Sequence, residues 1–277
     1  MRALPPAECR VASGTGASGV AVVYTRAMRP RFPAGRHRPE PAGPAGSRIY
    51  AVGDIHGRAD LLERLHEMIA ADAQRQPAPR RVVIYLGDYI DRGAHSREVI
   101  DLLLSQQLAG FEAVHLRGNH EEFLLRFLGD VSVGHNWLAY GGRETLQSYG
   151  IDPPHAMAAP DELARAQAAL DARLPRAHRD FLNGLALLHE EGDYAFVHAG
   201  VKPGVALDQQ QADDLLWIRD PFLESRAEFG RVVVHGHTIT PVPDVRPNRI
   251  GIDTGAFATG RLTCLVIDGT ASSFLQT

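Results

Sequence analysis

The chain has 277 residues, 44% of them hydrophobic, and a formal net charge of −4. A chain of this length and composition can bury a sizeable core in one domain or two, as ordinary globular proteins do. The two cysteines, Cys9 and Cys264, are too few for a disulfide framework, and no apolar run approaches the roughly 18 residues of a membrane helix.

Residues 1–47 contain seven Pro and six Gly without hydrophobic periodicity, and seven Arg against two Glu. Because this composition cannot bury enough surface to offset chain entropy, we predict a disordered tail without a function of its own, with contact to an anionic partner as the alternative. Met28 is an alternative start of the chain. Pro and charged residues interrupt any signal-peptide pattern, so we expect a cytoplasmic protein.

The rest of the chain, residues 48–277, is expected to form the folded domain and is net acidic, which argues against broad binding to nucleic acid. Of the 29 basic residues 28 are Arg, a bias typical of a GC-rich coding sequence. An arginine by itself is therefore weak evidence of function, and each one must be argued from its position.

Short apolar runs alternate with helical patterns from Arg48 onward. Strands are expected at 49–52, 82–86 and 112–116, with helices near 59–71 and 96–107 between them. The first helix places Leu61, Leu65 and Ile69 on one face, which is the period of an amphipathic helix packed on a sheet. Continuously apolar strands joined by helices predict a β-α-β-α-β unit with a parallel sheet.

Residues 129–184 lose the strand pattern, and we predict a helical cap inserted into the domain there. Strand-like runs then return at 185–189, 194–198, 231–235, 249–252 and 262–267.

Polar clusters follow five of the predicted strands. They are GDIHG (53–57), GDYIDRG (87–93), GNHE (118–121), HAG (198–200) and HGH (235–237). Ligands of α/β sheets gather beyond the carboxyl ends of the strands, so we expect these clusters to meet. Carboxylate, imidazole and amide groups without thiolate suit Mn, Fe or Zn. Six candidate ligands of these types are more than one tetrahedral metal site needs. They fit two ions that share a bridging carboxylate.

In this order, the motifs resemble the signature of the metallophosphoesterases. Within them they are most similar to the phosphoprotein phosphatase branch of Ser/Thr phosphatases, in its bacterial and phage-lambda-like forms. The resemblance covers about Arg48 to Asp268. It implies a calcineurin-like fold of the α/β (α+β) class, a sandwich of two mixed β-sheets flanked by helices.

The resemblance also implies a role for each candidate ligand. The first ion is held by Asp54 and His56, the two ions are bridged by Asp88, and the second ion is held by Asn119, His198 and His237. His235 ends the same strand as His237, but the family pattern Gly-His-Thr favours His237. Where many nucleases and phosphodiesterases of the superfamily have a second His, this chain has Ile239, which favours the phosphatase branch.

A phosphate substrate fits the expected charge, because two divalent ions against Asp54 and Asp88 leave an excess of about two positive charges. Arg92 matches the phosphate clamp of the family, and Arg219 matches a second clamp of the phage-type enzymes. Arginine can bind phosphate through two hydrogen bonds at once. Arg117 is expected to be structural.

No activated Ser or Cys nucleophile is evident, so we predict attack by a metal-bridging hydroxide. His120 is the candidate acid for the leaving group, and Asp91 would orient it and raise its pKa. The alternative for Asp91 is a helix N-cap.

We therefore predict a metal-dependent phosphatase of phosphoserine and phosphothreonine in proteins, with phosphotyrosine as a further option. It would use two divalent transition-metal ions, Mn first and Fe or Zn as alternatives, and would bind a phosphoprotein but no nucleic acid or membrane. The sequence leaves its oligomeric state open.

Two rival hypotheses are a symmetric diadenosine tetraphosphatase and an inactive phosphate-binding scaffold. The tetraphosphatases typically have GDLVARG and GNHD, so Asp91 and Glu121 favour the phosphatase, and the complete ligand set argues against the scaffold. Substrate choice is expected to depend on the cap, around Trp137, Tyr140, Arg143 and Tyr149.

Overall fold

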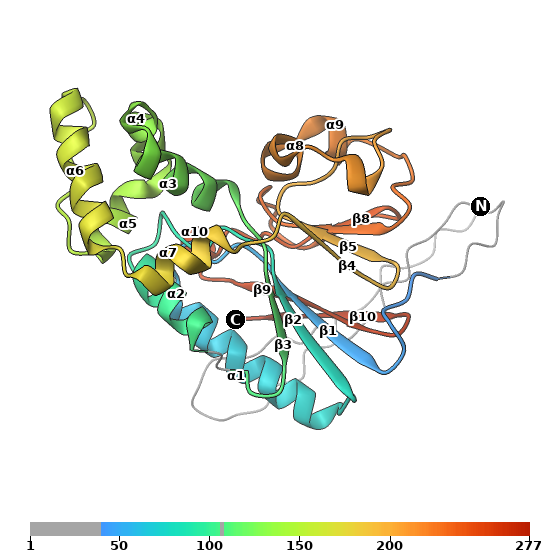
Figure 1. Cartoon of the computed structure of the whole chain (residues 1–277). Coiled ribbons are helices and arrows are strands. Elements are labelled where there is room, and N and C mark those ends of the chain that lie inside the picture. Colours follow the sequence, from blue (N-terminus) through green and yellow to red (C-terminus); the bar gives the residue numbers. More distant parts are fainter. Residues whose placement is uncertain (1–39, 106–107) are drawn as a thin grey trace.

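The computed structural model describes residues 40–105 and 108–277 (Figure 1). Most of the predicted tail, and with it Met28, lies outside these residues. The described part of the predicted tail, residues 40–47, packs against the domain, and Ser47 is already the first residue of a strand. The backbone N–H of Gly43 donates to Gly269 O at 2.9 Å, and that of Ala42 donates to Asp193 Oδ2 at 3.0 Å.

The first sheet has five strands in the order β10-β9-β1-β2-β3. Its strands are β1 (Ser47–Val52), β2 (Arg80–Tyr85), β3 (Glu112–His115), β9 (Thr263–Asp268) and β10 (Ala271–Gln276). β1, β2 and β3 are parallel, whereas β9 and β10 run antiparallel to their neighbours. The crossovers are α1 (Ala59–Arg75) and α2 (Ser96–Leu104), which confirms the predicted β-α-β-α-β unit.

The second sheet also has five strands, in the order β4-β5-β6-β8-β7. They are β4 (Leu188–Glu191), β5 (Tyr194–Val197), β6 (Val232–His235), β7 (Asp244–Val245) and β8 (Arg249–Gly251). β5, β6 and β8 are parallel, and β4 and β7 are antiparallel edge strands. The predicted fold class, two mixed sheets flanked by helices, is confirmed.

Alternating side chains on β1 and β2 build the core on both faces of the first sheet. Ile49 and Ile84 face the second sheet and pack with Phe196 and Val234 from it. Tyr50, Val52, Val83 and Tyr85 point the other way, into the apolar cluster under α1 and α2. Each fully buried side chain of this kind stabilises the fold by about 1.5–3 kcal/mol. The outer face of the second sheet is covered by α8 (Ala212–Trp217) and α9 (Asp220–Leu223) (Figure 1).

The chain between β3 and β4 is helical and gathers beside the sheets, at the left of Figure 1. Its elements are α3 (Asn119–Gly129), the 3-10 turn η1 (Val131–Val133), α4 (Gly134–Trp137), the π-helical turn η2 (Leu138–Gly142), α5 (Arg143–Ser148), α6 (Pro160–Arg173) and α7 (Arg176–Asn183). This segment, residues 119–183, is called the helical insertion below. It begins directly at the GNHE motif, so its first helix starts inside the predicted site.

Two strands of the structure, β7 and β10, are absent from the sequence predictions. β10 carries Ser272 and Ser273 in an edge position, which hides the apolar pattern. A signal was nevertheless present, because Gly269 and Thr270 form a two-residue hairpin loop between the paired residues Asp268 and Ala271, and glycine suits the positive φ of 56° at the first loop position. In the described ranges, no helix is both long and apolar enough to cross a bilayer.

Two short elements complete the fold. The 3-10 turn η3 (Leu207–Gln209) precedes α8, and α10 (Ala256–Thr259) follows β8.

Candidate metal centre

Backbone strain in the described residues is confined to the predicted site. The non-glycine residues with positive φ are His56 (48°), Asp88 (52°), Asp91 (71°), Arg92 (68°) and His237 (60°). For residues with a side chain, this conformation costs roughly 1–2 kcal/mol each. Such strain persists only where surrounding contacts hold it, and it is typical of functional sites.

The carboxylate of Glu121 supplies part of that restraint. Its Oε2 accepts from the backbone N–H groups of Asp88 and Gly118 at 2.9 Å each, and its Oε1 accepts from that of Tyr89 at 2.8 Å. Glu121 thus joins the loop after β2 to the loop after β3. Burial, and then the charge of Asp88, raise the pKa of Glu121 to about 7. Sequence reasoning used Glu121 only to separate two families and missed this role.

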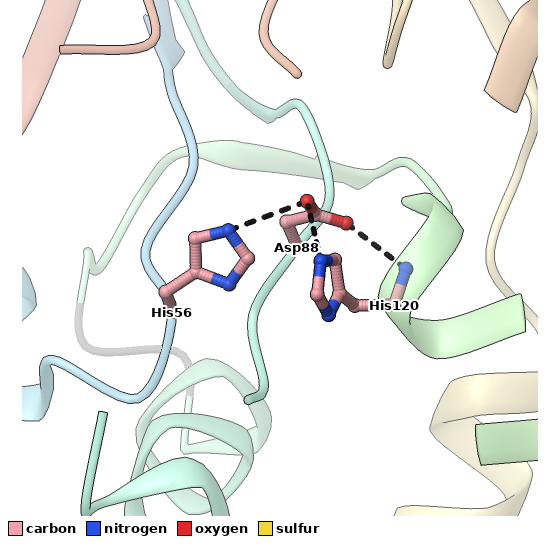
Figure 2. A group of neighbouring side chains, drawn as sticks. All are labelled: His56, Asp88 and His120. Atoms are coloured by element: carbon pink, nitrogen blue, oxygen red, sulfur yellow. Dashed lines mark hydrogen bonds and ion pairs between the residues drawn. The ribbon is translucent and has the colours of Figure 1, made fainter. Parts of the chain in front are cut away.

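The Asp88 carboxylate lies at the centre of the cluster. His56 Nε2 and His198 Nε2 lie 3.4 Å from its two oxygens, and His120 Nε2 lies 3.8 Å away. Figure 2 shows how His56, from the loop after β1, and His120, from the start of α3, point toward it. Burial alone would raise the pKa of Asp88, but the surrounding imidazoles outweigh it and lower this pKa.

A second group forms where the loops after β3, β5 and β6 meet. Asn119 Oδ1 lies 2.8 Å from both His198 Nε2 and His237 Nδ1. Within the described chain, two sets of three possible ligands have all their donor atoms within 4.8 Å of one another. They are His56, Asp88 and His120, and Asp88, His198 and His237. Asp88 is common to both, as a bridging ligand would be.

Two backbone carbonyls fix the imidazole tautomers. His56 Nδ1 donates to Ile90 O and His198 Nδ1 to Leu86 O, both at 2.9 Å. The lone pair of each Nε2 therefore faces the cluster, as in metal-ligating histidines. At His198 this lone pair faces the amide oxygen of Asn119, which also has only lone pairs to offer. Two acceptors so close repel each other, and a cation bound between them would remove that repulsion.

The donor set fits divalent transition-metal ions on two further observations. His237 Nε2 is buried and has no hydrogen-bond partner among the described residues. Burial lowers the pKa of His56 to about 3 and that of His237 to about 2, so both imidazoles are neutral and can offer lone pairs. Carboxylate and neutral imidazole without thiolate are the ligands that Mn, Fe and Zn accept.

Asp54 lies at the side of the cluster rather than inside either set of three. Its two oxygens accept from the backbone N–H of His237 at 3.0 and 3.2 Å. Gly236 leaves the room for this contact, because a Cβ there would lie 2.0 Å from Asp54 Oδ1. Burial, followed by the charges of Asp253 and Asp88, raises the pKa of Asp54.

Sequence reasoning missed Asp253, a buried carboxylate beside Asp54. Asp253 Oδ1 accepts from the backbone N–H of Gly255 at 2.8 Å, and its Oδ2 has no hydrogen-bond partner among the described residues. Burial raises the pKa of Asp253 to about 6. The signal was available, because Asp253 follows a predicted strand in the same way as the other polar clusters.

Arg92 lies directly over the cluster. Its Nη1 is 2.9 Å from His56 Nε2 and its Nη2 is 3.0 Å from His120 Nε2. The guanidinium Cζ stands 4.9 Å from the ring centre of Phe257, within cation–π range. Its half-buried positive charge therefore faces the same space as the candidate ligands.

His120 and Asp91 form a buried hydrogen-bonded pair with Nδ1 and Oδ2 2.7 Å apart. Burial alone would lower the pKa of His120, but the charge of Asp88 and the contact with Asp91 outweigh it and raise this pKa. The alternative for Asp91, a helix N-cap, does not match the structure. α2 begins at Ser96, and the Asp91 carboxylate contacts His120, Trp137 and Thr145 instead.

The sequence analysis also assigned roles to Arg219, His235 and Arg117. Arg219 is exposed, its Nη1 lies 3.3 Å from Thr238 Oγ1, and, after burial, its charge is among the causes that lower the pKa of His198 and of His237. His235 belongs to neither set of possible ligands and packs edge-on against Phe222. Arg117 pairs with Glu122 at 3.0 Å, a structural contact.

Comparisons with known proteins place the chain among phosphate-ester hydrolases. The family model described as calcineurin-like phosphoesterase matches residues 47–262. The asymmetrical bis(5'-nucleosyl)-tetraphosphatase PrpE of Bacillus thuringiensis is 25% identical over 233 residues, 77% of this chain and 88% of that protein. Serine/threonine-protein phosphatase 2 of Escherichia coli is 28% identical over 225 residues, 78% of this chain and 90% of that protein.

A solved structure described as a candidate diadenosine tetraphosphatase shares the fold. It matches with a TM-score of 0.55 at 21% identity and covers 84% of this chain and 95% of that one.

Proposed function

The chain belongs to the calcineurin-like phosphoesterase family, and we propose that it is a two-metal phosphatase acting on phosphoserine and phosphothreonine in proteins. The observation that carries this proposal is the buried His120–Asp91 pair beside Asp88. A serine or threonine alkoxide is a very basic leaving group and needs a proton. A nucleotide leaving group is far less basic, so an oriented acid favours the alkyl ester.

The proposed ligands divide between two ions. Asp54, His56 and Asp88 would hold the first ion, and Asp88, Asn119, His198 and His237 would hold the second, with Mn as the first choice and Fe or Zn as alternatives. When bound, such a pair of ions supplies an acidified water as the nucleophile and neutralises charge on the phosphate.

Arg92 binds the phosphate and in doing so frees the acid. In the structure its guanidinium donates to His120 Nε2, so that nitrogen cannot carry a proton at the same time. Phosphate oxygens compete for the guanidinium through stronger, charge-assisted hydrogen bonds. As Arg92 turns to the phosphate, His120 Nε2 can hold the proton that passes to the leaving oxygen.

Arg219 would bind the same phosphate from the other side of the site. It lies on the loop after α8 and contacts Thr238, the residue next to His237. Because its side chain is exposed, we assign it a smaller share of the binding energy than Arg92.

A second candidate function is hydrolysis of dinucleoside polyphosphates, favoured by an aromatic row beside the site. Tyr140 is 57% exposed and stacks on Phe123 at 5.9 Å, Phe123 meets Trp217 at 5.0 Å, and the Trp217 ring lies 6.5 Å from that of His237. An open aromatic face can stack a nucleobase. PrpE of Bacillus thuringiensis is named for this activity.

One comparison tests both functions. The Mn²⁺-loaded protein is assayed with a phosphoserine peptide, para-nitrophenyl phosphate and diadenosine tetraphosphate, and an Asp88→Asn preparation serves as the control for contaminating activity. We expect the highest kcat/KM with the peptide. A strong preference for the dinucleotide would replace the first function by the second, and turnover of none of the three would contradict both.

A further inference from the structure

The helical insertion contributes two side chains to the acid machinery of the site. We propose that Trp137 and Thr145 are positioning residues that hold the Asp91 carboxylate in the orientation that His120 requires. This inference rests on the proposed function, in which His120 protonates the leaving group.

The Asp91 carboxylate accepts from three side chains and is fully buried. Its Oδ2 accepts from His120 Nδ1 at 2.7 Å and from Trp137 Nε1 at 3.0 Å. Its Oδ1 accepts from Thr145 Oγ1 at 2.6 Å. With both oxygens engaged, the carboxylate plane cannot rotate about the Cβ–Cγ bond without breaking a hydrogen bond.

The backbone of the same loop is also held from the insertion. Asp91 N donates to Thr145 Oγ1 at 2.9 Å, and Arg92 N donates to Gly141 O at 3.1 Å. Both loop residues have positive φ, so they need such contacts to stay in place. Gly141 must be glycine for this approach, since a Cβ there would lie 2.6 Å from Arg92 N.

The two donors are themselves rigid. Trp137 is fully buried at the end of α4, and its ring packs 4.9 Å from that of Phe127. Thr145 is fully buried in α5, and its hydroxyl also lies 3.1 Å from Ser96 Oγ. Neither side chain can follow a rotation of Asp91, so the insertion fixes the carboxylate rather than merely covering it.

The orientation matters because one imidazole has to serve two partners. Asp91 must accept from His120 Nδ1 so that Nε2 points toward the Asp88 cluster, where the leaving oxygen departs. If the carboxylate turns, the imidazole loses its fixed tautomer and direction, and proton transfer slows. Hydrolysis of esters whose leaving group needs no proton from His120 should keep its rate.

The test compares Thr145→Val with Thr145→Ser in the Mn²⁺-loaded enzyme. Valine keeps the volume but removes the hydroxyl, whereas serine keeps the hydroxyl. We expect Thr145→Val to lower kcat for the phosphoserine peptide by about tenfold, part of the 10²-fold or more that general acid catalysis contributes. For para-nitrophenyl phosphate, a good leaving group, we expect less than a twofold loss. Thr145→Ser should recover most of the peptide activity, and KM should stay unchanged.

Two further variants separate positioning from packing. Trp137→Phe keeps a buried ring but removes the N–H donor, and should show the same substrate dependence with a smaller loss. Thr263→Val is a matched control, because Thr263 is equally buried and hydrogen-bonded in β9, away from Asp91. It should show no dependence on the leaving group.

The decisive comparison places Thr145→Val in a His120→Asn background. If Thr145 acts through His120, the second substitution adds no further loss with the peptide, whereas a purely structural role lowers activity equally in both backgrounds. Equal losses for the two substrates, or additive losses in the double variant, would overturn the inference. If His120→Asn itself shows no leaving-group dependence, the proposed function fails instead, so the two failures are distinguishable.

Discussion

Two groups of histidines, one around Asp88 and one around Tyr85, have ring nitrogens withdrawn from solvent but different surroundings. His56 and His237 lie at the carboxyl ends of their strands, around Asp88 and Asn119. His66 lies on α1, and the partly buried His115 is the last residue of β3; both contact Tyr85. Burial lowers the pKa in both groups, to about 4 for both His66 and His115.

Unpaired ring nitrogens also occur in both groups. His66 Nδ1 and His115 Nε2 have no hydrogen-bond partner among the described residues, just as His237 Nε2 has none. His66 and His115 line a cavity of about 300 Å³. Apart from these two histidines and Tyr85, its described lining residues are apolar, and none of them is a carboxylate. A buried, neutral imidazole is therefore insufficient to define a metal site, and the convergence on Asp88 makes the difference.

The largest effect is expected from Asp88→Asn, which removes the carboxylate common to both sets of ligands. Losing several kcal/mol of charge stabilisation by the ions should lower kcat with para-nitrophenyl phosphate on the order of 10³-fold. The matched control is Asp101→Asn, since Asp101 also pairs with a buried histidine, His178, at 2.9 Å. If both variants lost activity equally, Asp88 would have no special role among the carboxylates that pair with a buried histidine.

The next effect is that of His120→Asn. We expect a loss of about 10²-fold with the phosphoserine peptide and a clearly smaller loss with para-nitrophenyl phosphate, because only the alkoxide needs the proton. Steady-state kinetics with both substrates measures the difference. Equal losses would contradict the role of His120 as the acid.

The same substitution in each region, His237→Asn and His66→Asn, compares the two regions directly. The first removes a proposed ligand, so it should lower metal occupancy and reduce activity by at least the roughly 10–100-fold that loss of a hydrogen-bonding partner of a ligand causes. The second should leave metal content unchanged and lower the free energy of unfolding by about 1–3 kcal/mol, because it disrupts the buried contact with Tyr85. Elemental analysis and urea unfolding report the two quantities. Metal loss in His66→Asn would refute the contrast.

The smallest effect concerns pH and stability away from the metals. The pKa of His66 falls from 6.5 to about 4 on burial, so between these values the unfolded chain binds more protons than the folded one. Stability is therefore complete above pH 6.5 and is lost as the pH falls toward 4. At pH 5 we expect a loss of about 1–2 kcal/mol from His66, measured by urea unfolding at pH 7 and 5. His66→Asn should reduce this slope, and an unchanged slope would contradict the assignment.

Much of the site could be predicted from the sequence because one physical rule covers it. The carboxyl ends of parallel strands meet at one end of a sheet, so the polar residues that follow β1, β2 and β3, such as Asp88 and Asn119, were expected together. His198 follows β5 of the second sheet, and its place beside them depends on how the two sheets pack. The two sheets packing face to face came from the family resemblance, because local patterns do not show which sheet covers which.

Other features depend on tertiary contacts that no local pattern reveals. Glu121 acts on backbone N–H groups of a loop more than thirty residues away. The roles of Trp137 and Thr145 depend on the contact between the helical insertion and the loop after β2. Phe257 was missed because its role is to lie beneath Arg92, a contact between distant segments. Asp253 was missed for a different reason, since the strand-end rule was applied only where histidine or a paired motif followed.

Metal stoichiometry tests the central claim most directly, namely that side chains from separate loops share one binuclear centre through Asp88. The folded wild-type protein is loaded with Mn²⁺, desalted and subjected to elemental analysis beside folded Asp88→Asn. We predict two ions per chain in the wild type and fewer than one in the variant. A well-folded wild type that retains no ions, or a variant that retains two, would contradict the account.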